Sequence, residues 1–161
     1  MPAGAPNTSL DTRTRILDAA LACFLEVGYE QTTIARIRGH SGVSNGTLFH
    51  RFPTKEAIAE ALFVESIASF QQGLWRLLAQ RPRSLRGAVR GTIAHQIEWI
   101  EANVERARFV YTRGTLEGDS PGSAELEEMN RELASAYQAW LQPLVERGAV
   151  RPMSMLVHNA I

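Results

Sequence analysis

Several features are scarce in these 161 residues, and each scarcity excludes a class of protein. The single cysteine, Cys23, excludes an internal disulfide and any multi-cysteine zinc or iron–sulfur site. The longest uninterrupted apolar run is seven residues, Ala19 to Leu25, whereas a membrane-spanning helix needs about 20. The first residues also lack the apolar core of a signal peptide. We therefore expect a cytoplasmic protein with no membrane partner.

Catalytic motifs are equally scarce. The sequence contains no phosphate-binding loop and no nucleophile motif, and Cys23 has no neighbouring histidine or second cysteine. The four histidines show no metal-ligand spacing: His40, His50, His95 and His158. We expect a protein that is not an enzyme and that holds neither a metal nor a cofactor.

Acidic residues are absent from one window of the chain. The net charge is zero, with 17 basic and 17 acidic residues, yet no Asp or Glu occurs between Gln31 and Lys55. This window contains six basic or titratable side chains: Arg36, Arg38, His40, His50, Arg51 and Lys55. A local cationic patch on a neutral protein indicates a surface for anions such as nucleic acid, and the alternative is an ordinary solvated face.

Strand-like alternation is also missing, and apolar residues recur at helical spacing along the whole chain, which predicts an all-α fold. Residues 1–11, rich in Pro, Ala, Gly, Asn and Ser, are expected to form a flexible arm, and residues 114–122 a loop. The predicted helices cover residues 12–27, 34–39, 45–52, 55–79, 85–101, 104–113 and 124–147.

The predicted helix ends rest on local chemistry. Hydroxyl side chains stand directly before five of the helices and can accept a hydrogen bond from a first-turn amide: Thr33, Ser44, Thr54, Ser84 and Ser123. Gly28 and Gly148 follow the first and last helices as stop residues. The fifth helix has an expected apolar face made of Leu85, Val89, Ile93, Ile97 and Ile100.

Two short helices joined by a glycine-containing turn, at residues 34–52, fit a helix-turn-helix, in which the second helix enters the DNA major groove. The spacing predicts that Val43, Leu48 and Phe52 bury one side of the second helix. The outward side then carries Asn45, Thr47, Phe49 and His50. Asn can bond adenine edges, and Thr offers a hydroxyl and a methyl group to thymine. The alternative is an ordinary corner in a helical bundle.

Lys55 provides a separate indication. It lies in the first turn of its predicted helix, where the helix dipole disfavours a cation. A phosphate bound there would contact both the free amides and the ammonium group. The positive charge of Lys55 would then favour binding instead of opposing the helix dipole. The alternative is a solvated surface lysine.

The sequence resembles the N-terminal domain of the tetracycline-repressor (TetR) family of transcriptional regulators from Arg15 to about Ala59. The matching positions are Arg15-Ile-Leu-Asp-Ala-Ala, Phe24, Gly28-Tyr29, Thr32-Thr33-Ile34, Ile37, Gly42-Val43-Ser44-Asn45-Gly46-Thr47-Leu48-Phe49, Phe52 and Lys55-Glu56. The resemblance implies a three-helix DNA-binding domain over residues 12–54 and a divergent helical ligand-binding domain over residues 55–161. It also implies a homodimer that binds double-stranded DNA at a palindromic operator.

The resemblance further implies a repressor that an unidentified small-molecule effector releases from its operator. Carried onto this chain, it gives the DNA-facing residues Thr33, Ser44, Asn45, Thr47, Phe49, His50 and Lys55, to which the basic window adds Arg36 and Arg38. The family usually has tyrosine at Phe49 and alanine at Arg38, and Gly39 lowers the helicity of the same short helix. Either Arg38 extends toward a phosphate, or this helix is locally loosened.

An effector pocket would need aromatic and polar side chains after the DNA-binding domain. The candidates are Phe63, Phe70, Trp75, His95, Trp99, Phe109, Tyr111, Tyr137 and Trp140. The alternative for each is ordinary core packing, and for His95 a position at the edge of the core.

Proteins of the resembling family continue with two helices that pair in the dimer, whereas this chain ends at Met153–Ile161, a pattern typical of an amphipathic helix interrupted early. We expect either a truncated version or a dimer that forms through another surface. A second hypothesis follows from this end and from Phe49 and Arg38: a helical small-molecule sensor or protein-interaction module that no longer binds an operator.

Overall fold

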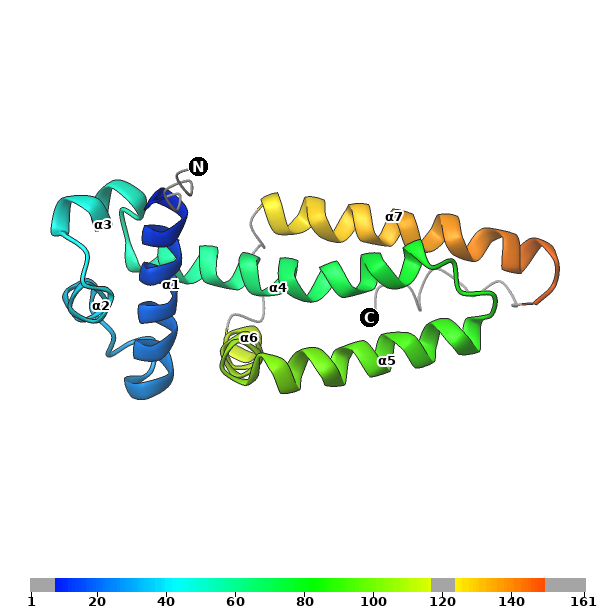
Figure 1. Ribbon diagram of the computed structural model, residues 1–161, viewed down its shortest axis with the longest axis horizontal. Helices are drawn as coiled ribbons and strands as arrows, with labels where there is room; N and C mark the ends of the chain where they lie inside the picture. Colours follow the sequence, from blue (N-terminus) through cyan, green and yellow to red (C-terminus); the bar gives the residue numbers. More distant parts are fainter. Residues whose placement is uncertain (1–7, 117–123, 150–161) are drawn as a thin grey trace, which may run out of the picture. The chain divides into compact units, whose positions relative to one another are not determined.

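The computed structural model describes residues 8–116 and 124–149, and all regular structure in this part of the chain is helical (Figure 1). The all-α prediction is therefore confirmed. The helices are α1 (Thr8–Val27), α2 (Ile34–Ser41), α3 (Asn45–Arg51), α4 (Lys55–Ala79), α5 (Leu85–Ala102), α6 (Val104–Leu116) and α7 (Ala124–Glu146).

The predicted helix ends follow the local chemistry. Four predicted caps each accept a hydrogen bond from the backbone N–H three residues later, at 3.1–3.2 Å: Thr33, Ser44, Thr54 and Ser84. Gly28 and Gly148 follow α1 and α7 with φ values of 83° and 71°, a conformation that glycine adopts without steric strain. The fifth predicted cap, Ser123, and the expected C-terminal helix at 153–161 lie outside the described residues.

Three helices are longer than predicted by more than one residue. α1 begins at Thr8, so the expected flexible arm is wrong for residues 8–11. No glycine or proline interrupts this stretch, and Asp11 in the first turn suits the positive end of the helix dipole. α2 reaches Ser41, and α6 continues through the expected loop to Leu116. A single glycine, such as Gly114 in α6, weakens a helix by only about 1 kcal/mol, which neighbouring helical residues can offset.

The first of two compact units contains the chain through Ile67 together with the segment from Asn103. Its core joins α1 to α2, α3, the beginning of α4 and α6. The rings of Phe24 and Phe109 stack with centroids 5.7 Å apart. Core residues with at most 1% exposure are Ile16, Leu17, Ala20, Cys23, Ile37, Leu48, Ile58, Ala59 and Leu62. This division differs from the predicted boundary between residues 54 and 55, because the early turns of α4 complete the core formed by α1, α2 and α3.

The second compact unit contains residues 68–102 and α7. Leu74 and Leu78 of α4 pack with Leu133 of α7, and partly buried side chains surround them: Phe70, Ala136, Tyr137 and Trp140. Gln71, which is 6% exposed, donates a hydrogen bond of 2.7 Å to the Asn130 side chain. Leu133, Tyr137 and Trp140 therefore lie on the face of α7 that packs on α4.

α5 packs on α4 through glycine positions. A Cβ atom on Gly73 would lie 1.9 Å from the His95 ring, and one on Gly91 would lie 2.6 Å from a Leu77 methyl group. Only glycine permits so close an approach. α5 therefore turns the face containing Ala88, Gly91 and His95 toward α4.

The expected apolar face of α5 is consequently not covered by any of the described helices. Four of its members are exposed in this chain: Leu85 (40%), Val89 (49%), Ile93 (53%) and Ile97 (53%). Ile100 is half-buried. The close contact made by the small residues on the other side of the helix decides the orientation.

Candidate DNA-binding surface

The turn between α2 and α3 is held from α1. Gly42 adopts φ +65°, and its N–H donates to the Arg38 carbonyl at 3.0 Å. A side-chain nitrogen of Arg15 donates to the Ser41 carbonyl at 2.7 Å, and it would lie only 3.1 Å from a Cβ on Gly42. This function of Arg15 was not predicted from the sequence. The feature of the sequence that could have indicated it is a basic side chain, which can donate hydrogen bonds to the unpaired carbonyls at the end of a helix.

The inward side of α3 matches the prediction. Leu48 is fully buried, Phe52 is 3% exposed and Val43 is partly buried against the same core. Burial of this edge fixes α3 as a rigid element on the first unit. α3 is thus held by side chains that leave its opposite side available.

The outward side of α3 is exposed, as predicted. Asn45, Thr47 and His50 are exposed, and 45% of Phe49 is accessible. The Ser44 and Thr47 hydroxyls lie 2.7 Å apart and hydrogen-bond to each other. An ordinary bundle corner would cover this side with other helices, whereas here no described segment buries it.

Of the predicted DNA-facing residues at α2, two are exposed and one is paired within the protein. Thr33 and Arg38 are exposed. α2 continues as regular helix through Arg38 and Gly39 to Ser41. Arg36 instead contacts Glu26 of α1 at 2.9 Å, and this hydrogen bond raises the pKa of Arg36. The guanidinium therefore links α2 to α1.

Cys23 lies beside this link. Burial raises the pKa of its thiol above the usual value, and the nearby positive charge of Arg36 opposes that effect. The side chain is fully buried. A buried thiol with a raised pKa is protonated and unreactive near neutral pH, as expected for a small core residue.

Lys55 is not a solvated surface lysine. Its ammonium group donates to the Tyr29 carbonyl at 2.8 Å and to the Glu30 carbonyl at 3.5 Å. It also lies 4.2 Å from the centre of the Tyr29 ring. These contacts place a positive charge at the start of α4 and hold the turn after α1 against it. A contact with phosphate stays a prediction.

The predicted effector residues fall in both compact units. Phe63, Phe109 and Tyr111 belong to the first unit. Phe109 is 6% exposed in its core, Phe63 is partly buried below Arg113, and 57% of Tyr111 is exposed. For Phe109 the structure favours the alternative of ordinary core packing.

The other six candidates belong to the second unit, which also contains all three tryptophans of the chain. His95 bonds the Phe70 carbonyl at 2.7 Å and stacks on the Phe70 ring, and Trp99 donates to Ser69 at 3.1 Å. Trp140 donates to the Pro82 carbonyl at 2.9 Å, and 39% of Trp75 is exposed. His95 is therefore a boundary residue in a packed aromatic cluster.

Neither a metal-binding cluster nor a membrane span occurs in the part of the chain that the structure describes. No three His, Cys, Asp or Glu side chains gather there in a way that could bind a metal ion. None of the helices in residues 8–116 and 124–149 is long and apolar enough to span a membrane.

Comparison with known proteins identifies relatives of the segment that contains α2 and α3. Residues 16–62 match the model of the family described as "Bacterial regulatory proteins, tetR family". The chain is 32% identical over 154 residues to the HTH-type transcriptional repressor Rv1474c of Mycobacterium tuberculosis. This match covers 94% of the chain and 75% of the repressor.

Solved structures show the same fold. A TetR family transcriptional regulator, PfmR from Thermus thermophilus, superposes with a TM-score of 0.62 at 23% identity, covering 87% of this chain and 75% of PfmR. The SmeT–triclosan complex superposes with a TM-score of 0.58 at 25% identity, covering 88% of this chain and 69% of SmeT. The likeness to these structures extends beyond residues 16–62 to most of the chain.

Proposed function

Since the chain belongs to the TetR family of bacterial regulatory proteins and is a helix-turn-helix transcriptional regulator rather than an enzyme, we propose that it is a repressor that binds a palindromic operator as a homodimer in the cytoplasm. A small-molecule effector would release it from that operator. The name of its M. tuberculosis relative, a transcriptional repressor, supports the direction of control.

The exposed side of α3 is the observation that supports DNA binding most directly. Asn45, Thr47 and His50 are accessible on a helix that Leu48 anchors rigidly, within a window that has no acidic residue. A helix placed in the major groove reads base edges with such side chains. Asn45 would read adenine, and Thr47 would offer its hydroxyl and methyl group to a thymine.

Positive charge beside α3 would position the helix on the DNA backbone. Arg38 is exposed on α2, and Lys55 presents a fixed charge at the start of α4. Phosphate contacts of this kind set the register on the duplex and make affinity depend on salt. Phe49 lacks the hydroxyl of the usual tyrosine, so one phosphate hydrogen bond worth about 1 kcal/mol is missing.

Effector binding is proposed for the second unit. SmeT, which shares the fold, has been solved in complex with triclosan. The second unit of this chain has an aromatic cluster with polar atoms at its edge, including Phe70, His95, Tyr137 and Trp140. An effector that binds better to one arrangement of these helices would shift the protein away from the DNA-bound state.

The proposal is tested by electrophoretic mobility shift with the DNA upstream of the protein's own gene, at several salt concentrations. Asn45→Ala should relax sequence preference at one base pair by about 1–3 kcal/mol. Lys55→Ala should weaken binding to all sequences and reduce the salt slope. Gln138→Ala, an exposed residue of α7, is the matched control and should change neither property. The absence of any salt-dependent shift would contradict DNA binding.

A second candidate function is a helical sensor or interaction module that no longer binds an operator. The observation in its favour is that Arg36 and Lys55 are engaged within the protein and that Phe49 lacks a hydroxyl. Calorimetric binding of an effector by a protein that shows no DNA retention would favour this candidate.

A further inference from the structure

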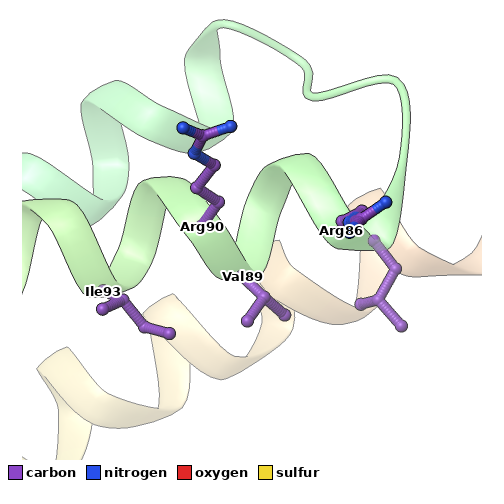
Figure 2. Close-up of a pocket in the computed structure, with 5 residues that line it drawn as sticks. Arg86, Val89, Arg90 and Ile93 are labelled. Carbon is purple, nitrogen blue, oxygen red and sulfur yellow. The ribbon is translucent and has the colours of Figure 1, made fainter.

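The turn between α4 and α5 lies in a second stretch of the chain without acidic residues. No Asp, Glu or Lys occurs from Ser66 to Ile97, and this stretch contains a cluster of five exposed arginines: Arg76, Arg81, Arg83, Arg86 and Arg90. The arginine cluster covers the last turn of α4, the connecting turn and the first two turns of α5. Figure 2 shows Arg86 at the start of α5 and Arg90 leaving the helix on a different side from Val89 and Ile93.

Several arginines elsewhere in the chain have acidic partners. Five of them form ion pairs with carboxylates: Arg13, Arg36, Arg106, Arg113 and Arg131. Within residues 8–116 and 124–149, no member of the arginine cluster forms an ion pair, and Arg76 donates to the Gln72 carbonyl of its own helix. Residues 150–161, which follow α7, contain no Asp or Glu. The cluster is therefore a concentration of positive charge that no described carboxylate compensates.

Two members of the cluster occupy positions that suit other residues better. Arg81 follows α4 with φ +49°, a left-handed conformation in which its Cβ atom crowds the backbone. The chain uses glycine in this conformation after α1, α2 and α7. Arg86 lies in the first turn of α5, where the positive end of the helix dipole disfavours a cation. Stability of the fold therefore gives no reason for these two arginines.

The backbone of the turn is fixed to the second unit. The Trp140 indole of α7 donates to the Pro82 carbonyl at 2.9 Å, and the Ser84 hydroxyl accepts from the Gly87 N–H at 3.2 Å. These bonds hold the backbone between the arginines, while the long side chains remain exposed and can reach a ligand. A ligand that binds here does not have to order the turn, so less entropy is lost on binding.

The chemistry of the cluster favours the phosphate groups of duplex DNA. A guanidinium group donates two parallel hydrogen bonds to a phosphate, and it is less strongly hydrated than an ammonium group. Charged residues are scarce at the centre of protein–protein interfaces, whereas protein–DNA interfaces are polar and strongly positive. Four of the eleven residues from Arg76 to Arg86 are arginines, a density typical of the second kind of interface.

We infer that the arginine cluster is a second DNA contact, independent of sequence and separate from the exposed side of α3. It binds phosphates through charge, so its affinity depends steeply on salt and little on the order of the bases. On a protein whose α3 binds an operator, a second contact of this kind raises the effective concentration of the protein on the surrounding DNA. The contact goes beyond the proposed operator binding and does not require it.

The test measures binding of the full chain to a random-sequence duplex of about 30 base pairs by fluorescence anisotropy, at about 50 to 200 mM salt. R83Q/R86Q should weaken binding about tenfold at the lowest salt and reduce the salt slope by about 2, because two phosphate contacts are lost. The control R108Q/R131Q removes the same charge from exposed arginines outside the cluster. It should change the affinity by less than about twofold and leave the salt slope unaltered.

Arg81 separates a binding role from a structural one. Arg81→Gly and Arg81→Gln should weaken binding to the duplex by the same factor, about threefold, and each should reduce the salt slope by about 1. Arg81→Gly alone should also raise the melting temperature by about 2–4 °C, because glycine relieves the left-handed strain. An affinity that neither substitution changes would contradict the inference.

Equal salt slopes for R83Q/R86Q and R108Q/R131Q would overturn the inference. Vesicles containing phosphatidylglycerol are measured in parallel. Arginine-dependent binding to these vesicles, without an effect on the duplex, would make a membrane surface the partner and would also overturn it.

A last comparison separates this inference from the proposed function. Sequence preference is measured on the same variants with the DNA upstream of the protein's own gene. An arginine-dependent contact with random DNA in a protein without sequence preference contradicts the proposed function alone. Sequence-specific binding by a protein whose cluster variant behaves like the control contradicts this inference alone.

Discussion

α3 and α5 both present a side that the described core does not cover, and the two sides differ in chemistry. α3 exposes an amide, a hydroxyl and an imidazole through Asn45, Thr47 and His50, whereas α5 exposes four aliphatic side chains. Polar groups remain hydrated until a partner offers matching donors and acceptors, as base edges do. Aliphatic groups lower the free energy of the system only when a partner removes them from water. Exposed helix faces of one small protein can therefore be assigned to different classes of partner by chemistry alone.

The largest effect is expected from breaking the support of α3. Leu48→Ala removes a fully buried side chain and should lower the free energy of unfolding by about 2–5 kcal/mol. DNA binding should weaken with it, because the outward residues lose their rigid base. Urea denaturation measures the stability loss. The control, His50→Ala on the exposed side, should stay within about 0.5 kcal/mol of the unaltered chain, and a similar loss in both variants would contradict the assignment of sides.

The next effect concerns the support of α5. Gly73→Ala places a methyl group 1.9 Å from the His95 ring, so we expect a loss of about 1–3 kcal/mol as α5 is pushed from α4. Thermal unfolding followed by circular dichroism measures it. An unchanged melting temperature would mean that the two helices lie further apart in solution. Restoration by the double change Gly73→Ala/His95→Ala would identify the ring as the source of the clash.

A gain in stability is expected at Gly39, an exposed position of α2. An added Cβ atom there meets open space, and the residue is helical with an ordinary φ. Gly39→Ala should therefore raise the free energy of unfolding by about 0.5–1 kcal/mol through the lower entropy of the unfolded chain. The same measurement that detects the loss at Gly73 detects this gain, and a decrease would show that α2 needs a flexible position.

The smallest effect is dependent on pH. Hydrogen bonds from its own backbone N–H, from the Thr54 hydroxyl and from Tyr29 lower the pKa of Glu56. The carboxylate therefore stabilises the folded state above its unfolded pKa of about 4.3, and the contribution disappears as the pH falls through the folded value. Because Glu56 is exposed, Glu56→Gln should cost only a few tenths of a kcal/mol at pH 7. The two proteins should become equally stable in acid, and a difference that persists there would exclude the charge as its cause.

The sequence predicts much of this architecture because its signals are local. Thr33, Ser44 and Ser84 identify helix starts through hydroxyl chemistry that needs no distant partner. Leu48 and Phe52 identify the buried edge of α3 through spacing alone. Once the buried side of α3 is known, its exposed residues are known too, because the remaining residues of a short helix all lie on the opposite side.

What the sequence misses depends on distant partners. The apolar periodicity of α5 identifies a stripe correctly but does not show which side a neighbour covers, and the small residues Gly73 and Gly91 decide that. Arg36 and Lys55 were both predicted to contact DNA from charge. Their engagement with Glu26 and with the Tyr29 carbonyl depends on how α1 lies against α2 and α4, and a one-dimensional pattern does not contain that information.

The placement of the indole rings has a practical consequence. Trp75, Trp99 and Trp140 all belong to the second unit, and the first unit contains none. Selectively excited tryptophan emission is therefore an optical probe of the second unit alone, whereas the far-ultraviolet signal reports on every helix. If the DNA-reading half melts before the other half, the two signals will separate along a denaturation curve, and no label has to be attached to observe it.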